Sequence, residues 1–327
     1  MKIFLNEGGN VFKGKTDRIK KEDIDPTLNS YFAELKRVFP KKSNIFSTEY
    51  FRPIGSVGKK DYSGDIDLAI DVSMFLDKDM SDESMKEWDI EPSFVDERFV
   101  KLRKRARTAT DEQLRIKAFL QELSVRINEK SQNIYIDEKK VGPGTVFGLY
   151  PQLTPEGEDL DVGVQIDWMI GNLEWLEFSY YSNTYAGVVK GLHRTQLMLS
   201  LFVNKGLSFN HTNGVKDKET GEVLATSPNE AIALLNTTYN FDITRATLED
   251  YFKLHAFIKA NISSEDYDSL IDIYLKILDK TRADIPEDLQ KEWMLRKDNL
   301  GLTGKFLPDD SKLKQNESFV SYLKGVI

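Results

Sequence analysis

The chain of 327 residues contains no cysteine and only three histidines, which are His193, His211 and His255. The absence of cysteine excludes disulfides, thiol nucleophiles and zinc sites built on thiolates, and it is typical of a reducing compartment. A metal-dependent phosphohydrolase would be expected to carry clusters of histidine and aspartate, which three scattered histidines do not supply. Catalysis that needs several histidines is therefore not expected.

Long apolar runs are also missing. No stretch approaches the roughly 18 consecutive apolar residues typical of a membrane-spanning helix. The first residues, MKIFLNEGGNVFKGK, are too interrupted for a secretory signal peptide. We therefore expect a cytoplasmic protein with no membrane partner.

Positive charge is in deficit, because the formal net charge is −8. The surface as a whole does not favour nucleic acid, so any site for a polyanion has to be a local basic patch. Hydrophobic residues make up 40% of the chain and charged residues 30%, which is typical of a folded protein. Its length suggests about two domains.

The pattern of the chain changes near residues 175–185. Before this point, strand patterns at 46–54, 65–71, 133–136, 145–150 and 160–171 alternate with helical patterns at 28–39 and 81–130. After it, a long helix is expected up to Gly206, then a loop around residues 210–222, and then several helices. We expect an α/β (α+β) fold with a mixed-sheet domain at 1–180 and a mostly helical domain at 181–327.

The stretch RPIGSVGKKDYSGDIDLAID, residues 52–71, stands out within the first half. It places Gly55 and Ser56 after an apolar strand and two aspartates, Asp65 and Asp67, in the next one. Alternation along that strand puts both carboxylates on one face and the apolar residues on the other. Gly55 would allow a tight turn beside a ligand, and Ser56 with its neighbouring amides could hold phosphate oxygens.

A third aspartate, Asp167, lies between Ile166 and Trp168 in the strand pattern LDVGVQIDWMIG. If this strand and the Asp65–Asp67 strand are antiparallel neighbours, the three carboxylates converge. Asp161, at the loop edge of the same strand, is the competing third residue. Asp167 is favoured because a carboxylate among apolar neighbours needs a reason to be there.

Three converging carboxylates repel one another unless a hard cation neutralises them. Ligands that are all oxygen, with room left for water and phosphate, are typical of Mg²⁺ rather than Zn²⁺. Two such ions can bind the attacking and leaving oxygens of a phosphoryl transfer.

The combination of IGS, a spacer, DIDLAI and a later strand with QID resembles the nucleotidyltransferase superfamily of DNA polymerase β. The spacer of eight residues between Ser56 and Asp65 is at or just below the short end of the usual range. The resemblance implies that Asp65, Asp67 and Asp167 are catalytic and bind two Mg²⁺ ions, with Mn²⁺ as a possible substitute. It also implies that Gly55 and Ser56 bind the phosphates of a nucleoside triphosphate, ATP by default.

Basic residues follow the third aspartate in YAGVVKGLHRTQ, where Lys190 and Arg194 share a helix face with His193. In the resembling family a cation at this place often reaches the triphosphate, which Lys190 or Arg194 would do here; the alternative is a solvated basic face. A denser run, residues 98–107, is either a track for an RNA or DNA acceptor or a solvated helix end paired with nearby acids.

The resemblance thus implies transfer of a nucleoside monophosphate from a nucleoside triphosphate to a hydroxyl, with release of pyrophosphate. The acceptor would be RNA or a nucleotide. The alternatives are a catalytically silent nucleotide-binding or nucleic-acid-binding module of the same fold, and nucleotidylation of a small molecule or a protein.

Overall fold

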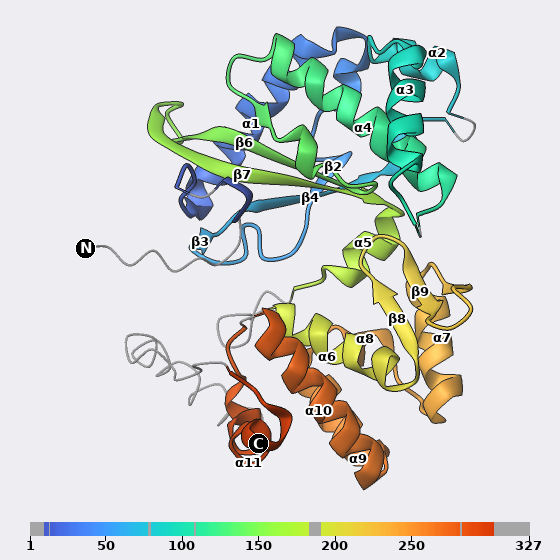
Figure 1. Ribbon diagram of the computed structural model, residues 1–327. Coiled ribbons are helices and arrows are strands. Elements are labelled where there is room, and N and C mark those ends of the chain that lie inside the picture. Colours follow the sequence, from blue (N-terminus) through green and yellow to red (C-terminus); the bar gives the residue numbers. More distant parts are fainter. Residues whose placement is uncertain are drawn as a thin grey trace. The chain divides into compact units, whose positions relative to one another are not determined.

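A five-stranded mixed sheet organises the first part of the chain in the computed structural model, which describes residues 10–12, 14–77, 80–107, 109–182, 191–281 and 283–303 (Figure 1). Its strands, in spatial order, are β2 (Phe51–Pro53), β4 (Ile66–Asp71), β7 (Asp159–Gly171), β6 (Thr145–Leu153) and β5 (Tyr135–Ile136). Only β4 and β7 pair in parallel; the other neighbours are antiparallel. The predicted α/β fold class with a mixed sheet is confirmed.

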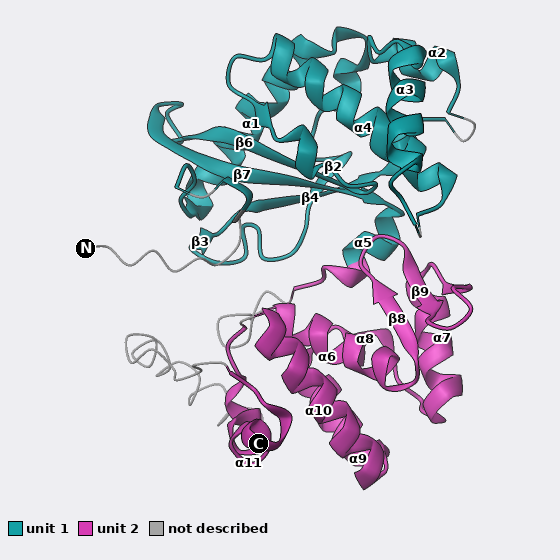
Figure 2. Cartoon of the chain, viewed as in Figure 1, with its two compact units in different colours: residues 1–177 teal, residues 178–327 magenta. Residues whose placement is uncertain are grey.

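The chain divides into two compact units, Met1–Glu177 and Phe178–Ile327, where the sequence pattern put the boundary at 180 and 181 (Figure 2). The first unit also holds the two-stranded sheet of β1 (Ile19–Lys20) and β3 (Tyr62–Ser63). Its helices are α1 (Lys21–Val38), α2 (Asp82–Glu87), α3 (Pro92–Arg103) and α4 (Asp111–Lys130). The division between the units falls within α5 (Leu173–Ser179).

Helices α1, α2, α3 and α4 gather on one face of the sheet (Figure 1). Helix α4 begins with a capping box, because the Thr110 side chain accepts from the Gln113 amide while the Gln113 side chain accepts from the Thr110 amide. Short 3₁₀ turns complete the unit at Asn10–Phe12, Pro40–Ile45, Val72–Met74 and Glu138–Lys140. Residues 46–54 were expected to form one strand, but only Phe51–Pro53 does so.

The second unit is mostly helical, with α6 (Gly191–Asn204), α7 (Pro228–Tyr239), α8 (Arg245–Leu248), α9 (Tyr251–Asn261), α10 (Ser264–Thr281) and α11 (Gln290–Leu300). It also contains an antiparallel sheet of β8 (Leu207–Asn210), β9 (Gly214–Asp217) and β10 (Val223–Ala225) where a loop was expected. The short strands were missed because polar turn residues dominate that stretch. No helix among the described residues combines the length and apolar character needed to cross a lipid bilayer.

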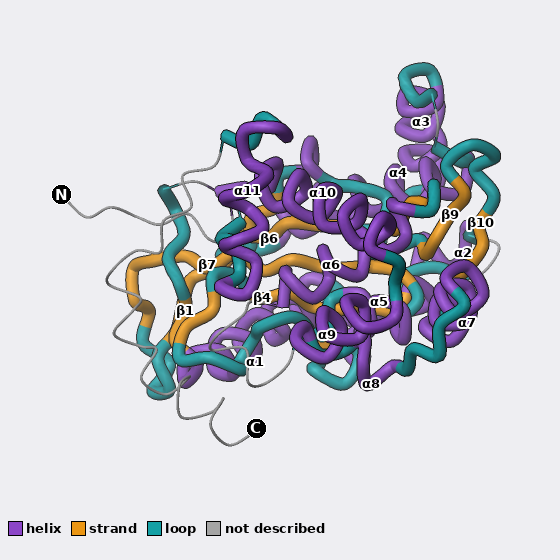
Figure 3. Tube along the Cα trace, turned by 90° about the horizontal axis from the view of Figure 1, so that it is seen from below, coloured by secondary structure: helices purple, strands orange, loops and turns teal. Residues whose placement is uncertain are grey.

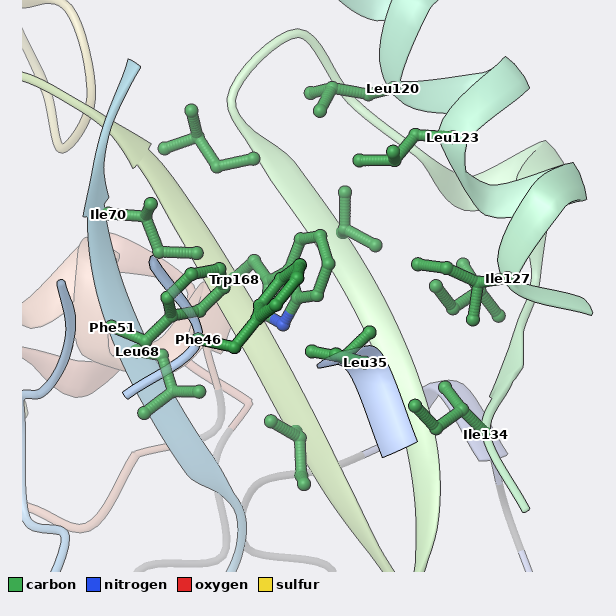
Figure 4. Packing of buried hydrophobic residues seen from close by; sticks show 14 of the residues in the cluster. Leu35, Phe46, Phe51, Leu68, Ile70, Leu120, Leu123, Ile127, Ile134 and Trp168 are labelled. Carbon is green, nitrogen blue, oxygen red and sulfur yellow. The ribbon is translucent and has the colours of Figure 1, made fainter. Parts of the chain in front are cut away.

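A core of aromatic and aliphatic side chains holds the carboxylate-bearing strands in place (Figure 4). Phe51 of β2 is fully buried, and its ring lies 5.4 Å from that of Trp168 in β7 and 6.2 Å from that of Phe75. Leu68 and Ile70 of β4 are equally buried beside them. Because side chains alternate along a strand, this packing turns the intervening positions of β4 and β7 to the opposite face.

Replacing Phe51 with alanine should lower the free energy of unfolding by about 3–5 kcal/mol, because it removes a ring from the centre of this core. The matched control is Phe94→Ala in α3, where 48% of the residue is exposed. That variant should stay within about 0.5 kcal/mol of the wild type. Urea unfolding followed by circular dichroism measures both, and equal losses in the two variants would contradict the assigned core.

Candidate metal centre

Two adjacent parallel strands bring the three predicted aspartates together. In the register of β4 and β7, Asp67 lies directly opposite Asp167, and Asp65 immediately precedes β4. The expectation that these strands are antiparallel was wrong. They run in the same direction because the chain crosses through α2, α3 and α4 before it returns in β6 and β7, and an alternating pattern reports the face of a side chain but not the direction of its strand.

One carboxylate oxygen from each of Asp65, Asp67 and Asp167 lies within 4.8 Å of the other two. Oxygens bound to one Mg²⁺ ion at about 2.1 Å can be at most about 4.2 Å apart. The cluster is therefore close to the spacing that a shared ion needs. The competing residue, Asp161, is exposed and is not part of the cluster.

The cluster departs strongly from an ordinary set of surface acids. Asp167 is only 4% exposed, and burial raises its pKa to about 8, with the negative charge of Asp65 adding to the effect and a hydrogen bond from Gln165 opposing it. Burial, together with the charges of Asp65 and Asp167, also raises the pKa of Asp67 well above its ordinary value. Both shifts express the cost of holding negative charges close together away from water.

A divalent cation fits these residues. The Oδ1 atom of Asp167 is buried and has no hydrogen-bond partner, while Oδ2 accepts a hydrogen bond of 2.8 Å from Gln165 Nε2. A buried polar atom without a partner is costly unless something binds it. All of the clustered ligand atoms are carboxylate oxygens, which suits Mg²⁺ or Mn²⁺.

The Gly55–Ser56 turn lies against the same cluster. Gly55 has φ +66°, and a Cβ atom at this position would come within 3.2 Å of Asp67 Oδ2. The left-handed backbone favours glycine here, and any larger side chain would crowd the Asp67 carboxylate. The turn is tied to the carboxylate strand by a hydrogen bond of 3.0 Å from the Ile54 amide to the Asp67 carbonyl.

Two residues near the site were not singled out from the sequence. Gln165 lies two positions before Asp167 and so shares its strand face, but alternation gives no sign that its amide bonds the carboxylate. Lys59 lies in the loop between the turn and Asp65, and burial lowers the pKa of its ammonium. A lysine between Gly58 and Lys60 looks like a solvated charge in the sequence, and only the folded loop shows that it is partly buried.

The two cations predicted to reach a triphosphate are not part of the described cluster. Lys190 lies outside the described residues. Arg194 is 2% exposed inside the second unit, where it donates hydrogen bonds to the carbonyl oxygens of Leu248 and Phe178. These bonds and its burial tie Arg194 to packing, so its phosphate contact stays a prediction that the structure does not support.

The basic run at 98–107 is partly engaged in holding α3 to its neighbours. Its ion pairs join Arg98 to Glu122 and Glu138, Lys101 to Glu97, and Arg103 to Asp111. No ion pair links Lys104, Arg105 or Arg107 to another described residue. The alternative of a helix end paired with nearby acids therefore describes about half of the run, and its binding of nucleic acid stays a prediction.

Comparison with known proteins yields little beyond these observations. No family model matches the sequence, and no curated protein matches it. Among solved structures, that of Leishmania infantum polymerase beta in a ternary P/T complex aligns with 72% of this chain and 77% of its own. The TM-score is 0.35 and the sequence identity is 11%.

The raised pKa of Asp167 predicts that Asp167→Asn stabilises the metal-free protein at pH 8. The folded state keeps a proton that the unfolded chain releases above about pH 4, so wild-type stability falls as pH rises from about 4 toward about 8. Asparagine has no such proton. The gain in unfolding free energy should be on the order of a few kcal/mol at pH 8 and should shrink to about 1 kcal/mol at pH 4.5.

Urea unfolding in EDTA at the two pH values measures this difference. Asp161→Asn, an exposed change of the same chemistry, is the control and should leave both midpoints unchanged. Equal stability of the wild type and Asp167→Asn at pH 8 would show that burial and the charge of Asp65 do not destabilise the ionised third carboxylate.

Proposed function

We propose that the protein is a Mg²⁺-dependent nucleotidyltransferase that moves a nucleoside monophosphate from a nucleoside triphosphate to a hydroxyl and releases pyrophosphate. The observation that carries this proposal is the convergence of Asp65, Asp67 and Asp167 beside the Gly55–Ser56 turn. The motif resemblance described above supports the same reading. A purely structural role does not account for three aspartates gathered where two of them have raised pKa values.

The three carboxylates would hold the metal. When bound, the metal neutralises the triphosphate and makes the acceptor hydroxyl a better nucleophile. The Oδ1 atom of Asp167 has no hydrogen-bond partner and would bind the metal, while its Oδ2 atom accepts a hydrogen bond from Gln165. Asp65 and Asp67 would supply the other negative charges that the bound ion neutralises.

The turn would orient the triphosphate. Gly55 brings the backbone close to Asp67, so amide groups and the Ser56 hydroxyl would bind β- and γ-phosphate oxygens beside the carboxylates. Lys59, in the same loop, would add a positive charge. In the reaction the acceptor oxygen bonds to the α-phosphorus, the bond from that phosphorus to the oxygen bridging the β-phosphate breaks, and the hydroxyl loses its proton.

The identity of the acceptor is not fixed by the metal centre. RNA or a nucleotide is the first choice, with ATP as the default donor, and both rest on the resemblance. Lys104, Arg105 and Arg107 form no ion pair with another described residue and would be available to an RNA backbone, but no aromatic side chains are interleaved with them to stack on bases. A small molecule or a protein as acceptor is an alternative outcome of the test below.

Asp65→Asn and Asp67→Asn should each reduce transfer by about 1,000-fold or more, because loss of a metal-binding charge removes several kcal/mol of transition-state stabilisation. Each variant is incubated with an α-³²P-labelled nucleoside triphosphate and Mg²⁺ or Mn²⁺, with and without total RNA. Asp161→Asn is the control and should retain wild-type activity.

The form of the labelled product identifies the acceptor. A ladder that needs RNA indicates tailing, a small product without RNA indicates a nucleotide acceptor, and label on protein indicates protein modification. Label from the γ-phosphate should appear only in pyrophosphate. Activity within twofold of wild type in both variants would reject the metal centre, and a wild-type protein that binds nucleotide without transfer would indicate the silent module.

A further inference from the structure

The segment before α1 runs alongside the strand that carries the third carboxylate. We call its described residues, 10–12 and 14–20, the N-terminal strap. The Asp17 amide donates to the Gly163 carbonyl at 3.0 Å, and the Gly163 amide donates to the Lys15 carbonyl at 3.2 Å. A Cβ atom at Gly163 would lie 2.8 Å from that Lys15 oxygen, so the strap approaches β7 as closely as glycine permits. Figure 3 shows β1, the end of the strap, beside β7.

From this position the strap reaches the metal centre through one buried side chain. The Val11 amide donates to Gln165 Oε1 at 3.1 Å, and Gln165 Nε2 donates to Asp167 Oδ2 at 2.8 Å. Gln165 is 2% exposed. Because an N–H group can bond only the oxygen end of the amide, the Val11 bond fixes which end of Gln165 faces Asp167. The Asp167 carboxylate is held through Oδ2, and Oδ1 is the atom left for a ligand.

The other end of the strap pairs with a strand that bonds to the Gly55–Ser56 turn. Strand β1 pairs with β3 in the register Ile19 to Ser63. The buried Ser63 hydroxyl donates to the Ser56 carbonyl at 3.5 Å, at the turn assigned to phosphate. One segment of chain thus bonds both to the residue that orients the third carboxylate and to the strand that supports the turn.

We propose that Gln165 is a positioning residue for the metal centre and that the Val11 amide of the N-terminal strap sets its orientation. The inference rests on the proposed function, because the position of Asp167 matters only if its free oxygen binds an ion. Residues that hydrogen-bond a metal ligand orient it and tune its affinity, and their loss typically weakens metal binding by about 10- to 100-fold. A merely structural Gln165 would satisfy buried polar groups and leave metal affinity unchanged.

The two hydrogen bonds from Val11 to Gln165 and from Gln165 to Asp167 are called the relay here. Two variants break it at different bonds. Val11→Pro removes the amide hydrogen while Gln165 and Asp167 stay intact, and the 3₁₀ turn at Asn10–Phe12 suits the φ of proline. Its control, Val11→Ala, trims the side chain but keeps the amide. Gln165→Met fills a similar volume but cannot donate to the carboxylate. Circular dichroism and urea unfolding in EDTA establish that each variant is folded, and Gln165→Met carries the test if Val11→Pro is not.

The readout is Mn²⁺ affinity, measured from the electron paramagnetic resonance signal of free Mn²⁺ in titrations of the full chain. Val11→Pro and Gln165→Met should bind Mn²⁺ about 10- to 100-fold more weakly than wild type, and Val11→Ala within about twofold. Excess Mn²⁺ should restore part of the lost transfer activity. Because bound Mn²⁺ also stabilises a folded protein, the rescue is interpreted only for variants that are folded in EDTA.

The outcomes separate this inference from the proposed function. If Asp67→Asn loses Mn²⁺ binding while both relay variants bind like wild type, the positioning role is overturned and the metal centre stands. If Gln165→Met weakens binding but a folded Val11→Pro does not, the strap has no part in it and the inference as stated fails. If wild type itself does not bind Mn²⁺, or Asp67→Asn binds it equally well, both the inference and the proposed function fail.

Discussion

Electrostatic repulsion among three carboxylates is the constraint on which the account of this protein depends. Asp65, Asp67 and Asp167 would separate or protonate if the chain left them free to do so. The parallel register of β4 and β7 keeps the carboxylates from separating, because it holds Asp67 directly opposite Asp167. Burial and the neighbouring negative charges together raise the pKa values of Asp67 and Asp167, and a bound cation would relieve the repulsion while the carboxylates stay ionised.

The packing on the opposite face of the sheet supplies the force that opposes this repulsion. Side chains alternate along a strand, so the two faces depend on the same register. A slip of β4 by one residue would turn Asp67 into the core and Leu68 out of it. Burial of Leu68, Trp168 and Phe51 therefore stabilises the register as well as the fold. The carboxylate cluster and the aromatic core lie on opposite faces of the same pair of strands.

Much of the site could be predicted from the sequence because it depends on local rules. Alternation placed Asp65 and Asp67 on one strand face, and an aspartate among apolar neighbours singled out Asp167 over Asp161; the cluster in the structure contains the same three residues. Strand direction was predicted wrongly, because period-two patterning is the same in parallel and antiparallel pairs. The orienting bonds of Gln165 could not be foreseen either, since the partner amide at Val11 is 154 positions away.

Less of the second unit could be predicted from the sequence. Its helices follow from periodic apolar residues, and Gly206, with φ +75°, lies two residues beyond the end of α6 as the pattern indicated. Strands β8–β10 are short, and turn-forming residues around them hide their alternation. The spacing of Lys190, His193 and Arg194 predicts a cation that reaches the triphosphate or a solvated basic face, yet the fold buries Arg194, which donates to the carbonyl of Leu248. Such contacts depend on tertiary packing, which spacing along one helix does not reveal.

The most direct test of the central claim is anomalous X-ray diffraction at the manganese edge, from crystals grown with Mn²⁺ and a non-hydrolysable nucleoside triphosphate analogue. We expect an anomalous peak at bonding distance from carboxylate oxygens of Asp67 and Asp167, with the triphosphate beside Gly55 and Ser56. Ordered triphosphate elsewhere, or a manganese peak away from the three aspartates, would contradict it.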